Sequence, residues 1–298
     1  MQKHDWTGVL PAITTPFTPD GAIDESFLAD HVRWLLGHGC RGIVALGSLG
    51  EGATLGFDEK VRVLSICRDA AGSSAPVIAG VSGLSTDECV RLARAAERAG
   101  CGGLMVLPPY VYRPDTRETH AHFDAVISAT PLSCMLYNNP IAYGTDLSAA
   151  DVAALADRHA NVHAVKESSG DVRRVSALRS VLDDRLSLLA GLDDMILEAV
   201  GVGARGWVAG LVNALPEESV RLFDLVCGGH AEEAFALYAW FLPLLRFDTV
   251  MKFVQLIKLV QHEVGHGAET VRPPRLALSG AERDAALVVI RSALAQRR

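Results

Sequence analysis

The sequence predicts an α/β fold, specifically a (β/α)8 TIM barrel with a C-terminal helical extension. Eight short apolar runs rich in Val, Ile and Leu recur through the first two thirds of the chain, each closed by Gly, Pro or Asn. Segments of helical period separate these runs at a spacing of roughly 20 to 35 residues, the size of a βα unit. The 298 residues suit one such barrel, because α/β barrels of about 250 residues or more form a single unit.

The runs predicted to be strands are continuously apolar rather than alternating, as is typical of parallel strands covered on both faces. They span residues 9–13, 42–46, 76–80, 103–107, 134–137, 162–166, 186–190 and 206–209. Eight strands with intervening helices favour a closed barrel over a doubly wound open sheet, although the strand count alone leaves the open sheet as an alternative.

The amphipathic segments between the strands are predicted helices, among them 26–38, 58–71, 86–99 and 117–129. Ser85 and Thr116 lie where the free N–H groups of a first helical turn need acceptors. After Val208 the pattern changes to helices alone, at about 217–227, 231–245, 250–264 and 280–295. No Pro/Gly/Ser-rich linker frees this tail, so we expect residues 1–225 to form the barrel and 226–298 a helical appendage packed on it.

Composition limits the classes of partner. Apolar residues make up 49% of the chain and charged residues 21%, values that exclude a disordered or collagen-like protein. The net charge of −7 argues against nucleic-acid and anionic-membrane surfaces, which carry the same sign, and favours a small-molecule partner. The six cysteines are scattered without a C-x-x-C pair and are expected to be core residues. Without a secretory h-region or a long apolar segment, the expected location is the cytoplasm.

One lysine stands out by its position. In a barrel of this kind the chemistry lies at the carboxyl ends of the strands, and Lys166 ends the buried run Val162–Val165. A lysine that is desolvated among apolar groups loses its proton more easily and can form a Schiff base with a carbonyl substrate. The alternative is a structural ion pair with Glu167 or an aspartate. The other lysines lie in the N-terminal tail or in helical segments with solvent-facing options: Lys3, Lys60, Lys252 and Lys258.

Two further elements are predicted at the same end of the barrel, where the carboxyl ends of the strands form its mouth. Tyr137 ends the preceding strand within Tyr137-Asn138-Asn139-Pro140 and would place a phenol beside Lys166, where it could shuttle protons; otherwise it is a packing residue. The loop Gly47-Ser48-Leu49-Gly50-Glu51 offers consecutive backbone N–H groups and a hydroxyl that can hold a carboxylate. It matches neither the P-loop nor the dinucleotide-binding motif, so no nucleotide cofactor is indicated.

The segment His262-Glu263-Val264-Gly265-His266 fits H-E-x-x-H, in which two helical histidines one turn apart bind zinc. Gly265 disfavours the helix, the segment lies in the appendage, and the sequence offers no obvious third ligand. We therefore interpret the match as a chance one and expect no metal site. A metal-dependent hydrolase stays as a remote alternative that would be inhibited by chelators and indifferent to borohydride.

The three elements of the predicted mouth together resemble the dihydrodipicolinate synthase / N-acetylneuraminate lyase family. They are GSLGE (47–51), YNNP (137–140) and VKESSGD (165–171). Further segments fall in the order and spacing of that family: PAITTPF (11–17), LPPYVYRP (107–114), LAGLDD (189–194) and GWVAG (206–210). The resemblance thus spans most of the chain and implies a (β/α)8 barrel enzyme of the lysine-imine type.

The resemblance assigns roles to individual residues. Lys166 would be the Schiff-base lysine and Tyr137 the proton-relay tyrosine, while Ser48 and the backbone of Leu49 would hold the carboxylate of a small, pyruvate-like 2-oxo acid. The carbonyls of two further residues would line the pocket, and a tyrosine would complete the substrate-binding set: Gly191, Val208 and Tyr110. The family implies no metal and no organic cofactor, and it implies a homotetramer built as a dimer of dimers, with a tyrosine that reaches into the partner's site.

The chain departs from the synthases of the family at positions that bear on the substrate. Those enzymes usually carry Thr-Thr where this sequence has Ser48-Leu49, a second tyrosine at the position of Val111, and an arginine at the position of Ala142. Without the arginine, the expected clamp for the carboxylate of the aldehyde substrate is missing. Tyr110 or Tyr112 could partly replace the missing tyrosine.

The combination of YNNP, KESSGD, AGLDD, GWVAGLVN (206–213) and TVRPPRLALSG (270–280) is similar to the branch that contains 1-pyrroline-4-hydroxy-2-carboxylate deaminase. The expected reaction is therefore deamination of that cyclic imine to 2-oxoglutarate semialdehyde. The alternatives are dihydrodipicolinate synthase, which joins pyruvate to aspartate semialdehyde, and a 2-keto-3-deoxy sugar acid aldolase or dehydratase. A non-catalytic 2-oxo acid binding protein is disfavoured, because binding alone needs neither Lys166 nor Tyr137.

Overall fold

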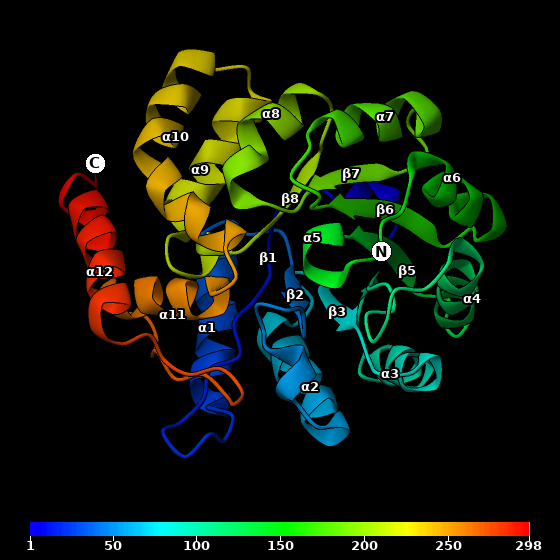
Figure 1. Cartoon of the computed structure of the whole chain (residues 1–298), viewed down its shortest axis with the longest axis horizontal. Coiled ribbons are helices and arrows are strands. Elements are labelled where there is room, and N and C mark those ends of the chain that lie inside the picture. Colours follow the sequence, from blue (N-terminus) through cyan, green and yellow to red (C-terminus); the bar gives the residue numbers. More distant parts are fainter. Residues whose placement is uncertain (298) are drawn as a thin grey trace.

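Eight parallel strands form the centre of the molecule in the computed structural model, which describes residues 1–297 (Figure 1). The strands are β1 (Gly8–Pro11), β2 (Ile43–Ala45), β3 (Val77–Val81), β4 (Gly103–Val106), β5 (Ser133–Asn138), β6 (Val162–Glu167), β7 (Ser187–Ala190) and β8 (Gly206–Ala209). Each of them overlaps a predicted strand and nearly all of their residues are buried, which explains why the runs are apolar without alternation.

The sheet closes into a barrel. Its strand order is β1-β8-β7-β6-β5-β4-β3-β2, and β1 meets β2 through a parallel bridge between Ala12 and Val44. The backbone N–H of Ile13 donates to the Val44 carbonyl across this seam at 2.9 Å. The predicted (β/α)8 barrel is therefore confirmed and the open-sheet alternative is wrong.

Helices follow the strands around the outside of the barrel, and the four predicted for the first half of the chain are all present. They are α1 (Glu25–Gly37), α2 (Phe57–Ala71), α3 (Thr86–Arg98), α4 (Thr116–Ile127), α5 (Pro140–Tyr143), α6 (Ala149–Arg158), α7 (Arg173–Leu182), α8 (Ile196–Gly201) and α9 (Pro216–Cys227). Ser85 caps α3 as expected, by accepting from the Glu88 N–H at 3.2 Å. The cap of α4 is Asp115 rather than Thr116, which is the first residue of the helix.

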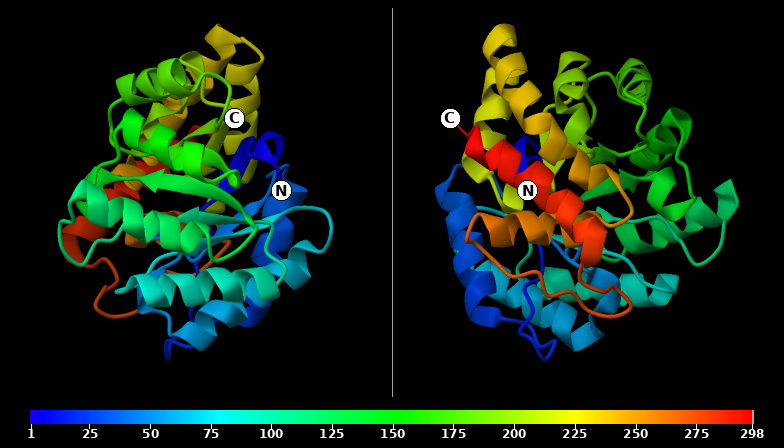
Figure 2. Two further views of the ribbon diagram at one scale, coloured as in Figure 1. Left: turned by 90° about the vertical axis from the view of Figure 1, so that its right-hand side faces the viewer. Right: turned by 60° about the vertical axis from the view of Figure 1, so that its left-hand side comes forward.

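The C-terminal tail forms three helices that pack on one side of the barrel: α10 (Ala231–Leu245), α11 (Phe253–Glu263) and α12 (Gly280–Ala295). Figure 2 shows α12 lying across this layer, in contact with α10 and α11. Helix α11 begins later than the predicted residue 250, because a 3₁₀ turn (Arg246–Thr249) follows α10 directly. This turn returns the chain to the barrel, where it packs against the 3₁₀ turn Asp193–Met195.

Two of the lysines expected to face solvent are buried. The Lys258 ammonium donates to Glu51 Oε1 at 2.7 Å and to the carbonyls of Thr15 and Thr270 at 2.8 and 2.7 Å. Lys60 pairs with Glu88 at 3.2 Å. The expectation was wrong for these two because each lies on the packed face of its helix, where a carboxylate compensates the buried charge.

Five of the six cysteines are buried, as expected for core residues, whereas Cys227 is exposed at the end of α9. Burial raises the pKa of the Cys67 thiol to about 12, so this side chain is an uncharged apolar packing group. Among residues 1–297, no helix combines the length and the apolar character that crossing a membrane requires.

Candidate active site

Lys166 and Tyr137 lie side by side at the carboxyl ends of β6 and β5. The register of the two parallel strands pairs these residues directly. Both side chains are buried, and the Lys166 Nζ lies 4.2 Å from the centre of the Tyr137 ring. The Tyr137 hydroxyl accepts from Asn139 Nδ2 at 3.0 Å. The amine and the phenol are therefore neighbours, as the sequence predicted from the ends of the two strands.

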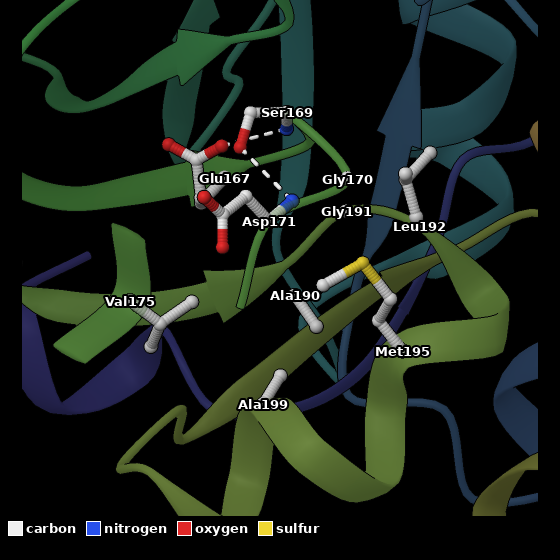
Figure 3. A pocket seen from close by; sticks show the side chains of 10 residues that line it. All are labelled: Glu167, Ser169, Gly170, Asp171, Val175, Ala190, Gly191, Leu192, Met195 and Ala199. Carbon is white, nitrogen blue, oxygen red and sulfur yellow. Dashed lines mark hydrogen bonds between the residues drawn. The ribbon is translucent and has the colours of Figure 1, made fainter. Parts of the chain in front are cut away.

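Glu167 does not form the ion pair with Lys166 that was considered as an alternative. Successive strand residues point to opposite faces, and Glu167 lines a pocket together with Val175 of α7, to which Lys166 does not contribute (Figure 3). The two carboxylate oxygens of Glu167 accept from Asn138 Nδ2 at 3.0 Å and from the Ser169 N–H at 2.6 Å. These bonds leave the lysine amine on the barrel side, free of that carboxylate.

Figure 3 also shows a small pocket behind these strands, between β6, β7 and the helices α7 and α8. Val175, Met195 and Ala199 line it on the helix side. The pocket shares the backbone of Gly191 with the barrel mouth, but Lys166 is not among its lining residues. We therefore place the candidate site at the mouth and not in this pocket.

Asp193, which follows β7, is one of two buried aspartates that interact electrostatically with Lys166. Its fully buried carboxylate accepts from Trp207 Nε1 at 2.9 Å, from the Gly210 N–H at 3.0 Å and from the Leu211 N–H at 2.7 Å. Burial raises the pKa of Asp193 to about 6, against the lowering effect of these donors and of Lys166. The carboxylate fixes the loop after β8 and supplies negative charge below the mouth.

Asp248 comes to the same place from the 3₁₀ turn Arg246–Thr249. Its carboxyl occupies the space that a side chain at Gly210 would fill, and Leu49 Cδ2 lies 3.4 Å from that same point. Burial and then the neighbouring Asp193 raise the pKa of Asp248 well above its usual range. A second buried carboxyl group with a raised pKa therefore lies beside Gly210 and interacts electrostatically with Lys166, and it comes from the turn that follows α10.

The glycine expected in the pocket, Gly191, makes room for the lysine. A Cβ built there would overlap Ser168 Oγ and would lie 2.7 Å from Lys166 Cε and 2.9 Å from the Glu167 carbonyl. No side chain fits without moving the lysine stem. The Ser168 hydroxyl beside it is buried and has no hydrogen-bond partner within residues 1–297, so it is available to a bound molecule.

We expect Gly191→Ala to remove most imine formation, because the added methyl must displace Lys166 or Ser168, a kind of overpacking that costs about 1–3 kcal/mol. The measurement is the mass added at Lys166 when pyruvate and sodium borohydride are present, together with the melting temperature. Gly201→Ala is the matched control, since a Cβ there meets no atom within 4 Å. Wild-type labelling of folded Gly191→Ala would contradict this account of the position.

The remaining predicted binding residues lie in β8 or in the loops that follow β2 and β4. Ser48 follows β2, and its hydroxyl is hydrogen-bonded to the hydroxyl of Tyr143. Leu49 is buried beside Gly210, and Val208 is buried within β8. Tyr110 is half-buried after β4, with its ring centre 5.9 Å from that of Tyr143. The structure thus brings Ser48 and Tyr110 together at Tyr143, whereas Leu49 lies beside Gly210 and Asp248.

Tyr143 is the residue that sequence reasoning missed. It ends the short helix α5, and its ring meets the Tyr137 ring edge-on at 5.7 Å between centres. Tyr110 and Tyr112 were the expected replacements for the tyrosine that the family's synthases carry at the position of Val111. Tyr110 packs near Tyr143, whereas Tyr112 is 55% exposed. Val111 has no hydroxyl and is 58% exposed, so the second phenol beside Tyr137 comes from Tyr143.

Local hydrogen bonds hold Tyr143 in place. Asn139 caps α5 by accepting from the Ala142 N–H at 3.0 Å, and Pro140 starts the helix with its fixed φ. Gly144 ends it with a φ of 71°, a conformation that favours glycine. Asn138 ties the following segment back by accepting from the Leu147 N–H at 2.9 Å. The sequence does indicate this short helix, because Asn139-Pro140 is typical of a helix start and Gly144 of a helix end, with Tyr143 between them.

The H-E-x-x-H segment does not form two helical ligands one turn apart. Helix α11 ends at Glu263, and Gly265 takes a φ of 76°. His266 therefore leaves the helix, stacks on Trp34 at 3.8 Å between ring centres, and shares a hydrogen bond with His31 at 3.0 Å. Glu263 pairs with Arg291 at 2.8 Å. These contacts give the segment a packing role, and within residues 1–297 no three His, Cys, Asp or Glu side chains are grouped as metal ligands.

The family model of the dihydrodipicolinate synthetase family matches residues 5–293. The 4-hydroxy-tetrahydrodipicolinate synthase of Rhizobium meliloti (strain 1021) is 32% identical over 269 residues, covering 90% of this chain and 92% of the relative. The synthase of Methanosphaerula palustris is 35% identical over 242 residues, covering 80% and 82%.

Solved structures of the same kind superpose along almost the whole chain. The 4-hydroxy-tetrahydrodipicolinate synthase of Methylacidiphilum fumariolicum SolV is 29% identical with a TM-score of 0.91, and the match covers 97% of each chain. YagE from E. coli K12, a family member solved in complex with pyruvate, is 26% identical with a TM-score of 0.91, covering 97% of this chain and 99% of its own. The chain therefore belongs to the dihydrodipicolinate synthetase family and is a lyase of that family.

Proposed function

We propose that the protein forms an imine between Lys166 and a small 2-oxo acid and carries out lyase chemistry on it. The observation that carries this proposal is the buried Lys166 Nζ, 4.2 Å from the Tyr137 ring centre at the carboxyl ends of two adjacent barrel strands. The pyruvate complex of the similar protein YagE supports the class of substrate. In this proposal Ser48 and the Leu49 backbone hold the substrate carboxylate, and Tyr110 with the carbonyls of Gly191 and Val208 lines the pocket.

The chemistry follows from an amine beside a phenol. The neutral Lys166 amine attacks C2, a C–N bond forms, and the former carbonyl oxygen takes a proton from Tyr137. The nitrogen then gives up one of its protons, which Tyr137 passes to the new hydroxyl, and this hydroxyl leaves as water while the nitrogen lone pair closes the C=N bond. The protonated imine then accepts the electron pair released when a bond at C3 breaks. Because the imine is itself the electron sink, this sequence requires no metal or organic cofactor.

Two reactions are candidates, and they rest on different observations. The names of the relatives favour condensation of pyruvate with aspartate semialdehyde, the reaction of a 4-hydroxy-tetrahydrodipicolinate synthase. The side chains of the mouth favour deamination of 1-pyrroline-4-hydroxy-2-carboxylate instead. Ala142 cannot bind the carboxylate of the aldehyde, and Asp248, whose pKa is raised by burial, is in this proposal the acid for the departing hydroxyl.

In the deamination, Lys166 attacks the cyclic imine carbon and opens the ring, which releases the ring nitrogen as a free amine. A proton then leaves C3, and the C4 hydroxyl departs as water with a proton from Asp248. The amine end tautomerises to an imine, and two hydrolyses release ammonia and 2-oxoglutarate semialdehyde from the enzyme. One water is consumed overall, since one is expelled and two are added.

Direct comparison of the two substrates tests the candidates. We expect the wild type to release one ammonia per hydroxypyrroline acid consumed and to condense pyruvate with aspartate semialdehyde only weakly. Ala142→Arg should raise kcat/KM for the condensation about tenfold or more, because a hydrogen bond to a charged group contributes about 1.5–3 kcal/mol. Ala150→Arg, at an exposed position of α6, is the control for added charge. Strong condensation by the wild type without ammonia release would establish the synthase instead.

A further inference from the structure

Three side chains that carry hydroxyls are in contact one after another at the mouth, and the resemblance does not account for the middle one, Tyr143. Tyr137 faces Lys166, Tyr143 meets Tyr137 edge-on, and the Tyr143 hydroxyl is hydrogen-bonded to that of Ser48. The three side chains come from β5, from α5 and from the loop after β2. This arrangement connects the group nearest the lysine to a hydroxyl on the opposite side of the mouth.

We propose that Tyr143 is the second proton-relay residue of this site and that it serves the lysine of its own chain. This inference rests on the proposed imine chemistry and adds to it the path by which Tyr137 regains its proton. Tyr137 gives a proton to the substrate oxygen, and the Tyr143 hydroxyl returns one to the Tyr137 phenolate. Ser48 then passes a proton from water to Tyr143, so that water replaces the proton that the series gave to the substrate.

The surroundings of Tyr143 suit this role. Burial, and then the neighbouring Tyr137, raise the pKa of Tyr143 well above its usual value, while the Ser48 hydrogen bond opposes the rise. The phenol is therefore protonated at neutral pH and can donate. Ser48 has both a donor proton and free lone pairs, so it can pass a proton in either direction.

The relay is complete within one chain. Helix α5 is fixed by the Asn139 cap and by the Gly144 stop, and both belong to the segment that directly follows β5. Val111, at the position where the family's synthases carry the tyrosine that reaches into the partner, has no hydroxyl to give. The proposed relay therefore needs no residue from a partner subunit.

Tyr143→Phe separates a relay role from a packing role, because it removes the hydroxyl and keeps the ring against Tyr137 and Tyr110. We expect kcat to fall about 100-fold, the lower end of what a proton-transfer group contributes, with KM changed less than threefold. Imidazole buffer should restore part of kcat by carrying the proton, an effect that a packing role would not produce. Tyr112→Phe, which alters an exposed phenol outside the mouth, should keep the wild-type kcat.

The proposed imine and the proposed relay are tested by different measurements. Trapping of pyruvate at Lys166 by borohydride in the wild type tests the proposed imine, and its absence would remove the basis for both proposals. If the wild type is trapped but Tyr143→Phe keeps the wild-type kcat, or loses activity without any response to imidazole, then the imine stands and the relay is wrong.

Mixing two inactive variants tests whether Tyr143 acts in its own chain. Lys166→Ala and Tyr143→Phe are co-expressed with different tags, and the mixed oligomer is purified through both. We expect no recovery, because no chain then holds both groups. Recovery toward one quarter or more of the wild-type kcat would show that the tyrosine serves a partner's lysine. If the native mass shows a monomer, the kinetics of the single Tyr143→Phe variant decide the assignment.

Discussion

Replacement of Lys166 by alanine is expected to abolish turnover of every 2-oxo acid substrate while the barrel stays folded. No other lysine can take over the chemistry. Lys258 and Lys60 are buried but paired with Glu51 and Glu88, and Lys252 pairs with Glu282 on the surface. The measurement is kcat together with the mass added on treatment with pyruvate and borohydride, which should appear in the wild type and vanish in Lys166→Ala.

Lys252→Ala is the matched control, because it removes an exposed lysine and should leave both kcat and the added mass unchanged. Circular dichroism and the melting temperature establish that Lys166→Ala is folded. A folded variant that keeps more than a trace of wild-type turnover would exclude the lysine imine from the mechanism.

Tyr137→Phe is expected to have the second-largest effect, a fall in kcat of about 10²–10⁴-fold, which is typical of a lost acid–base group. The phenylalanine ring keeps the contact beneath the Lys166 amine, so binding of the 2-oxo acid should change little. Only the hydroxyl is lost, and with it the acceptor for Asn139 Nδ2. Steady-state kinetics should therefore show the loss in kcat and not in KM.

Rapid-quench labelling identifies the slow step in Tyr137→Phe. If Tyr137 moves protons during imine formation, borohydride should trap the adduct at Lys166 more slowly than in the wild type, but to the same final extent. Tyr112→Phe again serves as the control for loss of a phenol hydroxyl. If Tyr137→Phe kept the trapping rate and the kcat of the wild type, Tyr137 would have only a packing role.

The strands and the two central residues of the site could be predicted because the information about them is local. A run such as Val162–Val165 is apolar on both faces, and whatever follows it must lie at one end of the barrel. Lys166 and Tyr137 were thus placed by strand position alone. Their contact needed only the assumption that neighbouring strands are in register, which the pairing of β5 with β6 confirms.

The residues that escaped prediction depend on how distant segments meet. Tyr143 reaches the mouth only because α5 stops after one turn, and the length of so short a helix is not encoded in a periodic pattern. Asp248 is brought back by the turn after α10, far along the chain from Gly210. The burial of Lys258 required knowledge of which helix face packs on the barrel. Conversely, His262–His266 matched a motif, but Gly265 ended the helix that the motif needs.

The ion pair between Glu51 and Lys258 has a consequence for how the molecule unfolds. Glu51 ends the loop that carries Ser48, and it also accepts from the Arg272 N–H at 3.0 Å, beyond α11. Peeling the C-terminal helices away would separate this buried pair and break the hydrogen bonds that Glu51 accepts, and loss of one partner of such a pair costs about 3–5 kcal/mol. Partial opening of this kind is therefore rare relative to complete unfolding. Barrel and helices should melt in a single cooperative transition, so the loop that holds Ser48 persists for as long as the C-terminal layer does.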